Sequence, residues 1–425
     1  MGRLAKKRIV ISLVFVVTLV GLWGGKKIFI RKAERERQEE ITELRREVAS
    51  AVADQIRKNK GLREEITPEI SIDYTIDEKL ENYIKGELKR YRSDYSSVVV
   101  IDNNSGDILA AVGYQRKYNQ FDYYQPFSST HPAASLFKIV TSASLLEGGG
   151  VEPDTKFTFR GKGTTLYKYQ LRDKRSRWQR NISLENAFAF SNNVVFGKAA
   201  IKKVNSYLLY EMAEKFGFNE EILNEVSFSR SKFEMPESQY QLAEMASGFN
   251  KKTLISPVHG AVMASIIARE GEYLRPSLLD RVVYHGENIW NKRKKAKRVI
   301  ERETAKDLKK MMSLTVKKGT ARGSFRRLSQ KLKKELILGG KTGSITGGIP
   351  FGKRDWFTAF AMPRDGEEGL GISICVMNVN VEKWYVRSSY LAKNIIEYYY
   401  KKIDPIKKKE VKFVELKPKR ENENV

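Results

Sequence analysis

The chain has 425 residues, 41% of them hydrophobic and 30% charged, which is enough apolar sequence for a sizeable core and excludes a disordered protein. A single cysteine, Cys375, excludes an intramolecular disulfide, and the three histidines lack the spacing of metal ligands, so we expect no metal and no cofactor. The formal net charge of +27 would suit a nucleic-acid binder, but the N-terminal sequence favours a membrane protein with no nucleic-acid partner.

The N-terminal segment is predicted to be a membrane anchor. Residues Ile9–Trp23 are uncharged and apolar with basic residues on both sides, and the run extends to Ile30 if two intervening lysines direct their amines to the membrane surface. No small-x-small cleavage site follows, which favours an anchor over a cleaved signal peptide. We therefore expect a cytoplasmic N-terminus at 1–8 and a transmembrane helix at 9–30. The rest of the chain is expected on the periplasmic or extracytoplasmic side, because the chemistry described below takes place there.

Residues 31–70 are predicted to form a charged juxtamembrane helix and linker. Glu, Arg and Lys dominate this segment, and an apolar stripe follows helical spacing through Ile41, Leu44, Val48, Val52 and Ile56. Such a narrow stripe either pairs with a partner helix or lies against the domain that follows.

One domain is predicted at 71–402, followed by a basic, disordered tail at 403–425. Thr75–Asp77 opens a helix, and the middle of the domain, from His131 to about Arg275, is mostly helical. The β-type runs lie at the two ends of the domain, at 96–102, 107–113, 336–346, 355–362 and 371–378, and an amphipathic helix follows at 388–401. These distant strands predict an α+β fold: one antiparallel five-stranded sheet with helices on both faces.

The first chemical motif pairs a serine with a lysine. Ser135 follows a proline-started turn and begins an apolar-periodic helix, and Lys138 lies three residues later on the same helical face. A hydroxyl is a poor nucleophile until a base takes its proton, and a lysine that is buried near other cations is neutral enough to do so. The amides at a helix N-terminus also stabilise an oxyanion. The same pattern recurs at Ser229 and Lys232 in a polar stretch without helical periodicity, which we interpret as chance.

Two further motifs supply polar groups. Ser191 and Asn193 follow a helix-like segment, where a hydroxyl and an amide can relay a proton and hold a substrate amide, although an ordinary helix cap uses the same residues. The run Gly339–Ser344 continues an apolar strand, and glycines within a strand mark the close approach of another group. Lys341 and Thr342 in this run can bind a carboxylate, although a basic sheet edge would have the same composition.

The order and spacing of the three motifs identify a family. Ser-x-x-Lys, then Ser-x-Asn 56 residues later (191 minus 135) and Lys-Thr-Gly 150 residues after that (341 minus 191), is the motif set of penicillin-binding proteins and serine β-lactamases. From about Ser71 to Tyr400 the chain therefore resembles a penicillin-binding protein transpeptidase domain. Four further segments also resemble the family's pattern: Thr75–Asp77, 99–110, Gly319–Ala321 and Trp356–Phe357.

The resemblance implies a role for each motif residue. The catalytic set would be the nucleophile Ser135, its general base Lys138, the proton relay Ser191, the substrate-backbone contact Asn193 and the positively charged Lys341. The substrate-binding set would be Thr342, Gly343 and Ser344, of which Thr342 and Ser344 match positions that recognise the terminal carboxylate of a donor peptide. The backbone amides of Ser135 and Ser344 match the family's oxyanion hole.

The function implied is that of a peptidoglycan D,D-transpeptidase, which cross-links stem peptides through an acyl-enzyme on Ser135 and is inhibited covalently by β-lactams. Between Ile30 and Ser71 there is room for little more than a helix, so a separate glycosyltransferase partner is expected to polymerise the glycan. The chain departs from the family's pattern at Met245–Phe249, where Gly-Gln-Gly is frequent, and at Ala133–Ala134, where Pro-Gly is frequent. Neither departure changes a group that performs the chemistry.

Other functions use similar residues. A D,D-carboxypeptidase passes the same acyl group to water. A serine β-lactamase or a β-lactam sensor of the same fold is a further alternative. Rapid hydrolysis of the drug would need a second carboxylate to activate the deacylating water, and Glu152 and Glu185 are candidates only by their distance along the sequence. A Ser-His-Asp hydrolase is disfavoured because Ser135 lacks a Gly-x-Ser-x-Gly elbow and His131 has no evident acidic partner. An intact motif set disfavours a non-enzymatic scaffold.

Two basic stretches have no place in this chemistry. Residues 291–298 and 322–334 are rich in Lys and Arg. They predict either a solvated basic face or a surface that binds anionic lipids, wall polymers or a partner protein.

Overall fold

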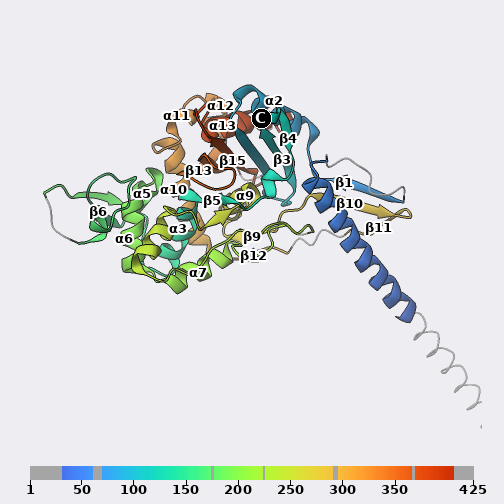
Figure 1. Cartoon of the computed structure of the whole chain (residues 1–425), viewed down its shortest axis with the longest axis horizontal. Coiled ribbons are helices and arrows are strands. Elements are labelled where there is room, and N and C mark those ends of the chain that lie inside the picture. The colour runs from blue at the N-terminus through green and yellow to red at the C-terminus, as the bar shows by residue number, and fades with distance from the viewer. Residues whose placement is uncertain are drawn as a thin grey trace, which may run out of the picture.

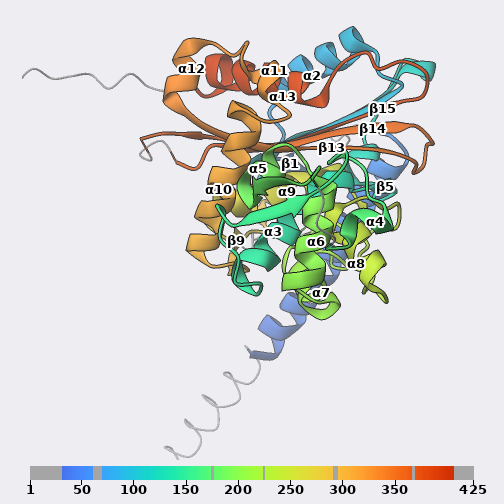
Figure 2. The ribbon, with the colours of Figure 1, turned by 90° about the vertical axis from the view of Figure 1, so that its left-hand side faces the viewer.

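The computed structural model describes residues 31–60, 69–173, 177–223, 225–290, 295–365 and 369–405. Its centre is a six-stranded antiparallel sheet that lies between two groups of helices (Figure 2). The helix at 31–57 projects from one end of the domain (Figure 1). The predicted α+β fold class is confirmed.

The sheet combines strands from both ends of the domain, as the sequence predicts. Its order is β13 (Leu336–Thr346), β14 (Lys353–Pro363), β15 (Ile372–Asn380), β2 (Tyr95–Asp102), β3 (Ile108–Gln115) and β4 (Gln120–Asp122). The distant halves meet where β15 pairs with β2, with Cys375 opposite Val99. The predicted number of five strands is wrong, because β4 adds a sixth at one edge. Three residues are too few to produce an alternating pattern that sequence reasoning can recognise.

Side chains alternate between two cores across the sheet. Val98 and Val100 point into the core on one face, whereas Val99 and Ile101 point into the core on the other. Four helices cover the first face: α2 (Glu78–Tyr91), α11 (Arg322–Phe325), α12 (Gln330–Glu335) and α13 (Ser388–Tyr398). The predicted opening of α2 is confirmed, because the Asp77 side chain accepts a hydrogen bond from the backbone amide of Leu80 and so caps the helix.

The larger helical group covers the second face and includes the predicted helical middle of the domain. Its members are α3 (Lys138–Glu147), α4 (Lys168–Leu171), α5 (Leu184–Ala189), α6 (Asn193–Lys203), α7 (Ser206–Lys215), α8 (Gln239–Ser247), α9 (Pro257–Ala268) and α10 (Arg302–Lys317). α9 is buried over its whole length and packs against β2, β14 and β15. A helix that is apolar on every side belongs inside a core, and α9 therefore supports both the sheet and the helices around it.

Small two-stranded ribbons interrupt this helical region, and the sequence did not predict them. They pair β5 (His131–Pro132) with β8 (Leu254–Ile255), β6 (Lys156–Phe159) with β7 (Arg180–Ser183), and β9 (Glu272–Tyr273) with β12 (Lys297–Arg298). Strands of two to four residues leave almost no periodic signal, so only the tertiary pairing defines them.

The helix at 31–57 packs on the domain through part of its apolar stripe. Val48, Val52 and Ile56 are buried in the core, and Ile41 and Leu44 lie partly buried beside it. An unpredicted three-stranded sheet lies at the same end, formed by β1 (Ile70–Tyr74), β10 (Leu279–Tyr284) and β11 (Glu287–Asn288). Of the two interpretations of the stripe, packing on the domain is confirmed.

The predicted transmembrane segment at 9–30 lies outside the described residues, as does the tail from 406. Within the described part of the chain, no helix combines the length and the apolar character that a membrane span requires.

Candidate active site

Ser135 lies on a short 3₁₀ turn, Ala134–Phe137, that leads from β5 into α3. The turn is held from two sides: Leu136 and Phe137 are buried in the core, and the indole Nε1 of Trp356 donates a hydrogen bond of 3.0 Å to the carbonyl of Pro132 just before the turn. Ser135 itself is half-buried. The hydroxyl is therefore presented to the cavity from a firmly packed backbone.

Lys138 lies one turn after Ser135 and is completely buried. Its Nζ is 2.8 Å from Ser135 Oγ and 2.7 Å from Asn193 Oδ1, and it also contacts the carbonyl oxygen of Ser247. Burial, together with the nearby charge of Lys341, holds the pKa of Lys138 well below its ordinary value. The uncharged form of the amine is therefore favoured more than in an exposed lysine, and the amine lies within reach of the Ser135 proton.

Ser191 lies in the connection between α5 and α6, and Asn193 is the first residue of α6. Ser191 has a φ of +56°, a left-handed conformation that turns the chain sharply, and Asn192 then caps α6 by accepting a hydrogen bond from the amide of Val195. The side-chain amide of Asn193 donates to the carbonyl of Thr164 at 2.9 Å while its oxygen faces Lys138. The side chain of Asn193 is thus fixed at both ends.

Lys341 enters the site from β13 and is also completely buried. Its Nζ donates to Ser191 Oγ at 3.0 Å and to the carbonyl of Thr342 at 2.9 Å. Burial lowers the pKa of Lys341 to about 7. The two serines that carry the proposed chemistry therefore each contact one lysine: Lys138 contacts Ser135, and Lys341 contacts Ser191.

The following residues of β13 form one wall of the site. Thr342 Oγ1 lies 2.6 Å from Oγ1 of Thr320, which comes from the turn after α10. A Cβ added to Gly343 would lie 3.3 Å from the Cβ atoms of both Ala134 and Trp356. The predicted close approach at this glycine is therefore present, because the strand lies directly against the turn that carries Ser135.

These elements enclose an open cavity of about 370 Å³. Six of the predicted residues line it, namely Ser135, Ser191, Asn193, Thr342, Gly343 and Ser344, and Lys138 and Lys341 lie buried behind them. The structure thus brings all eight predicted residues together. Sequence reasoning did not predict the other lining residues, which are Thr164, Phe190, Gly248, Phe249, Thr320, Asp355, Trp384, Arg387 and Ser389.

Gly248 has a close contact with the nucleophile turn. It ends α8 with a φ of +67°, and a Cβ added here would lie 1.9 Å from the carbonyl oxygen of Ala134. This glycine belongs to the Met245–Phe249 segment, which departs from the family's pattern, and the same segment provides the Ser247 carbonyl that contacts Lys138. The only sequence signal for its role was a glycine at the end of a helix.

Other residues considered from the sequence lie elsewhere. Ser229 Oγ accepts a hydrogen bond from the amide of Ser129, and Lys232 pairs through its backbone with Leu254, so the second Ser-x-x-Lys does not join the site. His131 is buried, and burial together with the charge of Arg354 lowers the pKa of His131 to about 3.

Neither glutamate considered for a β-lactamase lines the cavity. Glu152 precedes β6, and Glu185 lies in the first turn of α5. The one carboxylate among the described residues of the lining belongs to Asp355. Its Oδ2 accepts a hydrogen bond of 2.6 Å from the backbone amide of Ser388 at the start of α13, and burial raises the pKa of Asp355 to about 6.

Comparison with known proteins supports the resemblance seen in the sequence. The profile of the family described as "Penicillin binding protein transpeptidase domain" matches residues 96–383. Penicillin-binding protein 1F of Bacillus subtilis is 22% identical over 283 residues, a match that covers 65% of this chain but only 35% of that protein. The chain therefore spans about a third of the length of this curated relative.

Solved structures share the fold at low sequence identity. The D,D-transpeptidase domain of a peptidoglycan glycosyltransferase from Eggerthella lenta is 21% identical, with a TM-score of 0.62 and coverage of 78% of this chain and 83% of that one. Penicillin-binding protein A of Mycobacterium tuberculosis, solved as an imipenem acyl-enzyme, is 19% identical, with a TM-score of 0.59 and coverage of 77% and 79%.

Proposed function

The chain belongs to the penicillin-binding protein transpeptidase domain family, and from this membership we propose that it is a peptidoglycan D,D-transpeptidase with an acyl-enzyme on Ser135. One observation carries the proposal: the buried amine of Lys138 lies 2.8 Å from Ser135 Oγ, and the pKa of that amine is held well below its ordinary value. A base whose uncharged form is favoured, in contact with a hydroxyl, is the arrangement that activates a serine for acyl transfer.

In the first half-reaction, Ser135 Oγ attacks the carbonyl carbon of the penultimate D-alanine of a donor stem peptide while Lys138 takes its proton. A new C–O bond forms, and the oxyanion lies against the backbone amides of Ser135 and Ser344. The C–N bond then breaks, and the terminal D-alanine leaves after its amine receives a proton by way of Ser191. Thr342 and Ser344 bind the terminal carboxylate, and Asn193 binds the peptide backbone.

In the second half-reaction, an amine of an acceptor stem peptide attacks the acyl-serine, which forms the cross-link and frees Ser135. Attack by water instead would make the protein a D,D-carboxypeptidase. A β-lactamase is less well supported, because Glu152 and Glu185 are absent from the described lining and Asp355 is bound to the start of α13. Such a site is expected to hold a β-lactam acyl group without rapid hydrolysis.

Intact-protein mass spectrometry of the full-length chain after brief incubation with benzylpenicillin tests the acyl-serine. We expect a stable adduct of one drug mass in the parent protein and none in Ser135→Ala. No adduct and no drug turnover in a folded parent would exclude an acyl-serine enzyme, and fast turnover would favour a β-lactamase.

A donor pentapeptide ending in D-alanyl-D-alanine, supplied with and without an excess of an acceptor tetrapeptide, separates the two peptidase reactions. A transpeptidase is expected to form the cross-linked product in proportion to the acceptor. Release of D-alanine at the same rate with and without acceptor, and no cross-linked product, would show a carboxypeptidase.

We further propose that residues 9–30 anchor the protein in the cytoplasmic membrane, with the catalytic domain on the periplasmic or extracytoplasmic side, and that a separate glycosyltransferase supplies the glycan strands. The uncharged apolar run Ile9–Trp23 supports the anchor. Alkaline extraction of membranes tests it: the full chain is expected to stay with the membrane, and a chain that lacks residues 1–30 is expected to be released. In-cell cross-linking from the helix at 31–57 tests the partner.

A further inference from the structure

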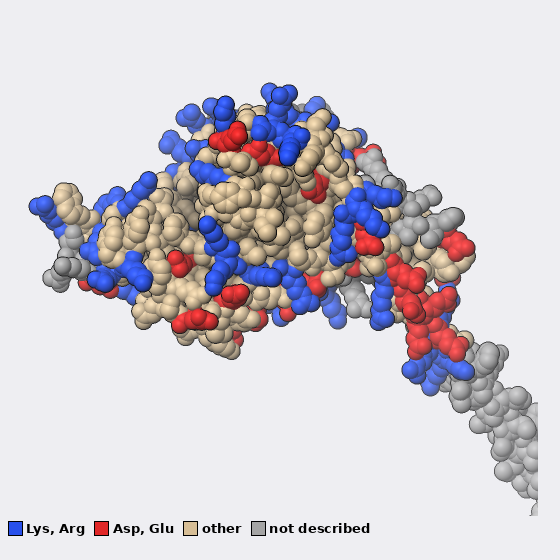
Figure 3. Space-filling model, in the orientation of Figure 1, with Lys and Arg blue, Asp and Glu red and all other residues tan. Residues whose placement is uncertain are grey.

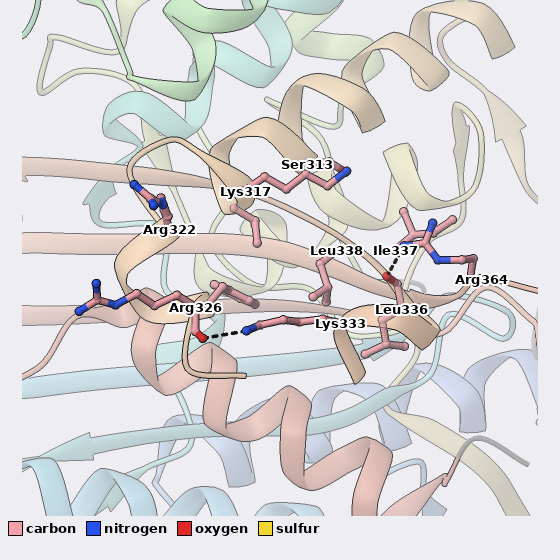
Figure 4. Close-up of a pocket in the computed structure, with 11 residues that line it drawn as sticks. Ser313, Lys317, Arg322, Arg326, Lys333, Leu336, Ile337, Leu338 and Arg364 are labelled. Carbon is pink, nitrogen blue, oxygen red and sulfur yellow. Dashed lines mark hydrogen bonds between the residues drawn. The ribbon is translucent and has the colours of Figure 1, made fainter. Parts of the chain in front are cut away.

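A second cavity, of about 320 Å³, lies outside the active site (Figure 4). Its walls come from α10, α11, α12, the start of β13 and the residue after β14. Five apolar side chains form its floor, namely Val316, Phe325, Leu336, Ile337 and Leu338. A cavity of this size and character falls within the range of ligand-binding sites in proteins.

The cavity opens on an unpaired edge of the central sheet. β13 is the terminal strand of the described sheet, so one of its two edges has no neighbouring strand. Ile337 packs against the core on one face and Leu338 against the core on the other, yet both line this cavity. A cavity that receives side chains from both faces of a strand must extend around the edge of that strand.

The rim is positively charged. Five of the eleven described lining residues are Lys or Arg, and none is Asp or Glu. Two of them are held in place by carbonyl groups: Lys333 Nζ donates to Arg326 O at 2.7 Å, and an Arg364 guanidinium nitrogen donates to Leu336 O at 3.0 Å (Figure 4). Lys and Arg side chains also stand over the region of α11 and α12 in Figure 3.

The remaining three cations are exposed and available to a ligand. Lys317, Arg322 and Arg326 form no salt bridge with any described acidic residue. Charges alone would protect a sheet edge from aggregation. Here they surround an apolar hollow, which offers a partner both a place for an apolar side chain and compensation for negative charge.

We propose that this cavity is a docking site for an extended, acidic segment of a partner protein, which adds as a strand to the free edge of β13 beyond Leu336. Leu336 itself is not part of this edge, because its amide donates to Leu332 O and its carbonyl accepts from Arg364. Backbone hydrogen bonds to the strand edge would provide affinity, apolar side chains would enter the hollow, and carboxylates would meet Lys317, Arg322 and Arg326. The basic stretch at 322–334, which the catalytic chemistry leaves unused, thereby acquires a function.

The terminal segments of the chain itself are poor candidates for this role because of their charge. Residues 1–30 contain six Lys or Arg and no acidic residue, and residues 406–425 contain seven Lys or Arg against four Glu. Both segments would be repelled by the cationic rim, and a partner protein with an acidic segment is the complementary occupant.

The docking site is a neighbour of the active site. Thr320 lines the catalytic cavity and contacts Thr342, whereas Arg322, two residues later, lines the second cavity. Lys317 and Arg326 line only the second cavity, so substitutions at these two positions distinguish binding there from binding of a peptide in the active site.

The test measures binding of a fluorescent, end-blocked heptapeptide of alternating glutamate and valine to the full-length chain. We expect saturable binding that weakens at least tenfold in the double variant Lys317→Glu/Arg326→Glu. The matched control Arg302→Glu/Lys306→Glu changes the same charge at the other end of α10 and is expected to bind within twofold of the parent. Binding to the parent is also expected to weaken at least fivefold between 50 and 500 mM salt, since exposed charges are screened.

One further protein variant tests the floor of the cavity, and two modified peptides test the strand pairing. Leu338→Thr keeps a β-forming residue but removes apolar surface, so weaker binding is expected. Because Leu338 also packs against the core, circular dichroism at the assay temperature checks that the variant is folded. In the peptide, N-methylation of either all valines or all glutamates blocks one edge of the added strand, and we expect one of these peptides to lose binding and the other to keep it.

Several results would overturn the proposal. These are no binding by the parent, equal binding by Lys317→Glu/Arg326→Glu, and equal binding by an alternating lysine–valine peptide. Binding that appears only after removal of residues 406–425 would show that the chain's own tail occupies the cavity. Binding of phosphatidylglycerol vesicles with the same dependence on Lys317 and Arg326, and none of the peptide, would identify a lipid surface instead.

Discussion

Gly248 provides a direct test of how the nucleophile turn is positioned. In Gly248→Ala the added Cβ would lie 1.9 Å from the carbonyl oxygen of Ala134 and 3.1 Å from the backbone nitrogen of Ser135. Since real Cβ atoms essentially never approach closer than 3.0 Å, the two segments must separate by at least 1.1 Å (3.0 minus 1.9). The atom that obstructs the methyl group is backbone, so no side-chain rotation relieves the contact.

A displacement of about 1 Å at a reacting group lowers the rate by about 100-fold. We therefore expect the second-order rate constant for acylation by a fluorescent penicillin to fall about 100-fold in Gly248→Ala. Stopped-flow fluorescence measures the rate, and circular dichroism checks that the variant is folded.

Gly150→Ala is the matched control. Gly150 has a φ of +58°, close to the +67° of Gly248, but no atom lies within 4 Å of an added Cβ. Both substitutions should cost about 1 kcal/mol of stability because a side chain is disfavoured in the left-handed conformation, and Gly248→Ala adds the cost of separating the two backbone segments. Only Gly248→Ala should lose acylation, and an acylation rate within threefold of the parent in a folded Gly248→Ala would refute this reasoning.

The remaining predictions concern the two buried lysines. Lys138→Met should slow acylation by about 10²–10⁴-fold, because general-base catalysis of this kind is lost. Lys198→Met, which removes a buried lysine outside the site, should leave the acylation rate unchanged in the same fluorescence assay.

Lys341→Met should slow acylation and yet raise the free energy of unfolding, by about 2–4 kcal/mol at pH 7, because a buried amine costs the folded state more than a thioether does. Between pH 7 and about 10 the unfolded chain keeps a proton on Lys341 that the folded protein has lost, so the free energy of unfolding of the parent should rise with pH over this window. Urea unfolding at several pH values measures this slope. An identical slope in Lys341→Met would show that the pH dependence does not come from Lys341.

Much of the fold could be predicted because a long periodic segment can be recognised from its own residues. β13 begins and ends at the residues that its apolar and glycine pattern predicted, and Asp77 caps α2 as its position before an amphipathic helix indicates. β4 and the small ribbons were not predicted, because a strand of two to four residues is too short to show an alternating pattern of apolar and polar residues. Such a segment is defined as a strand only by its pairing with a neighbouring strand. The anchor at 9–30 stays a prediction.

Ser135, Lys138, Ser191, Asn193 and Lys341 were recognisable from the sequence, because their side chains have chemistry that restricts both residue type and spacing. Tertiary structure alone determined what surrounds them. Burial lowers the pKa of both lysines, and the burial of an atom depends on every element packed around it.

The same distinction separates Gly248 from the other glycines. In the sequence it is an ordinary helix terminator, and only the approach of α8 to the nucleophile turn makes its missing side chain essential. The second cavity has the same origin: the sequence determined that residues 322–334 are basic, and the fold placed their charges around an apolar hollow at the open edge of β13. Contacts between distant segments depend on the whole packed chain, and no local stretch of sequence encodes them.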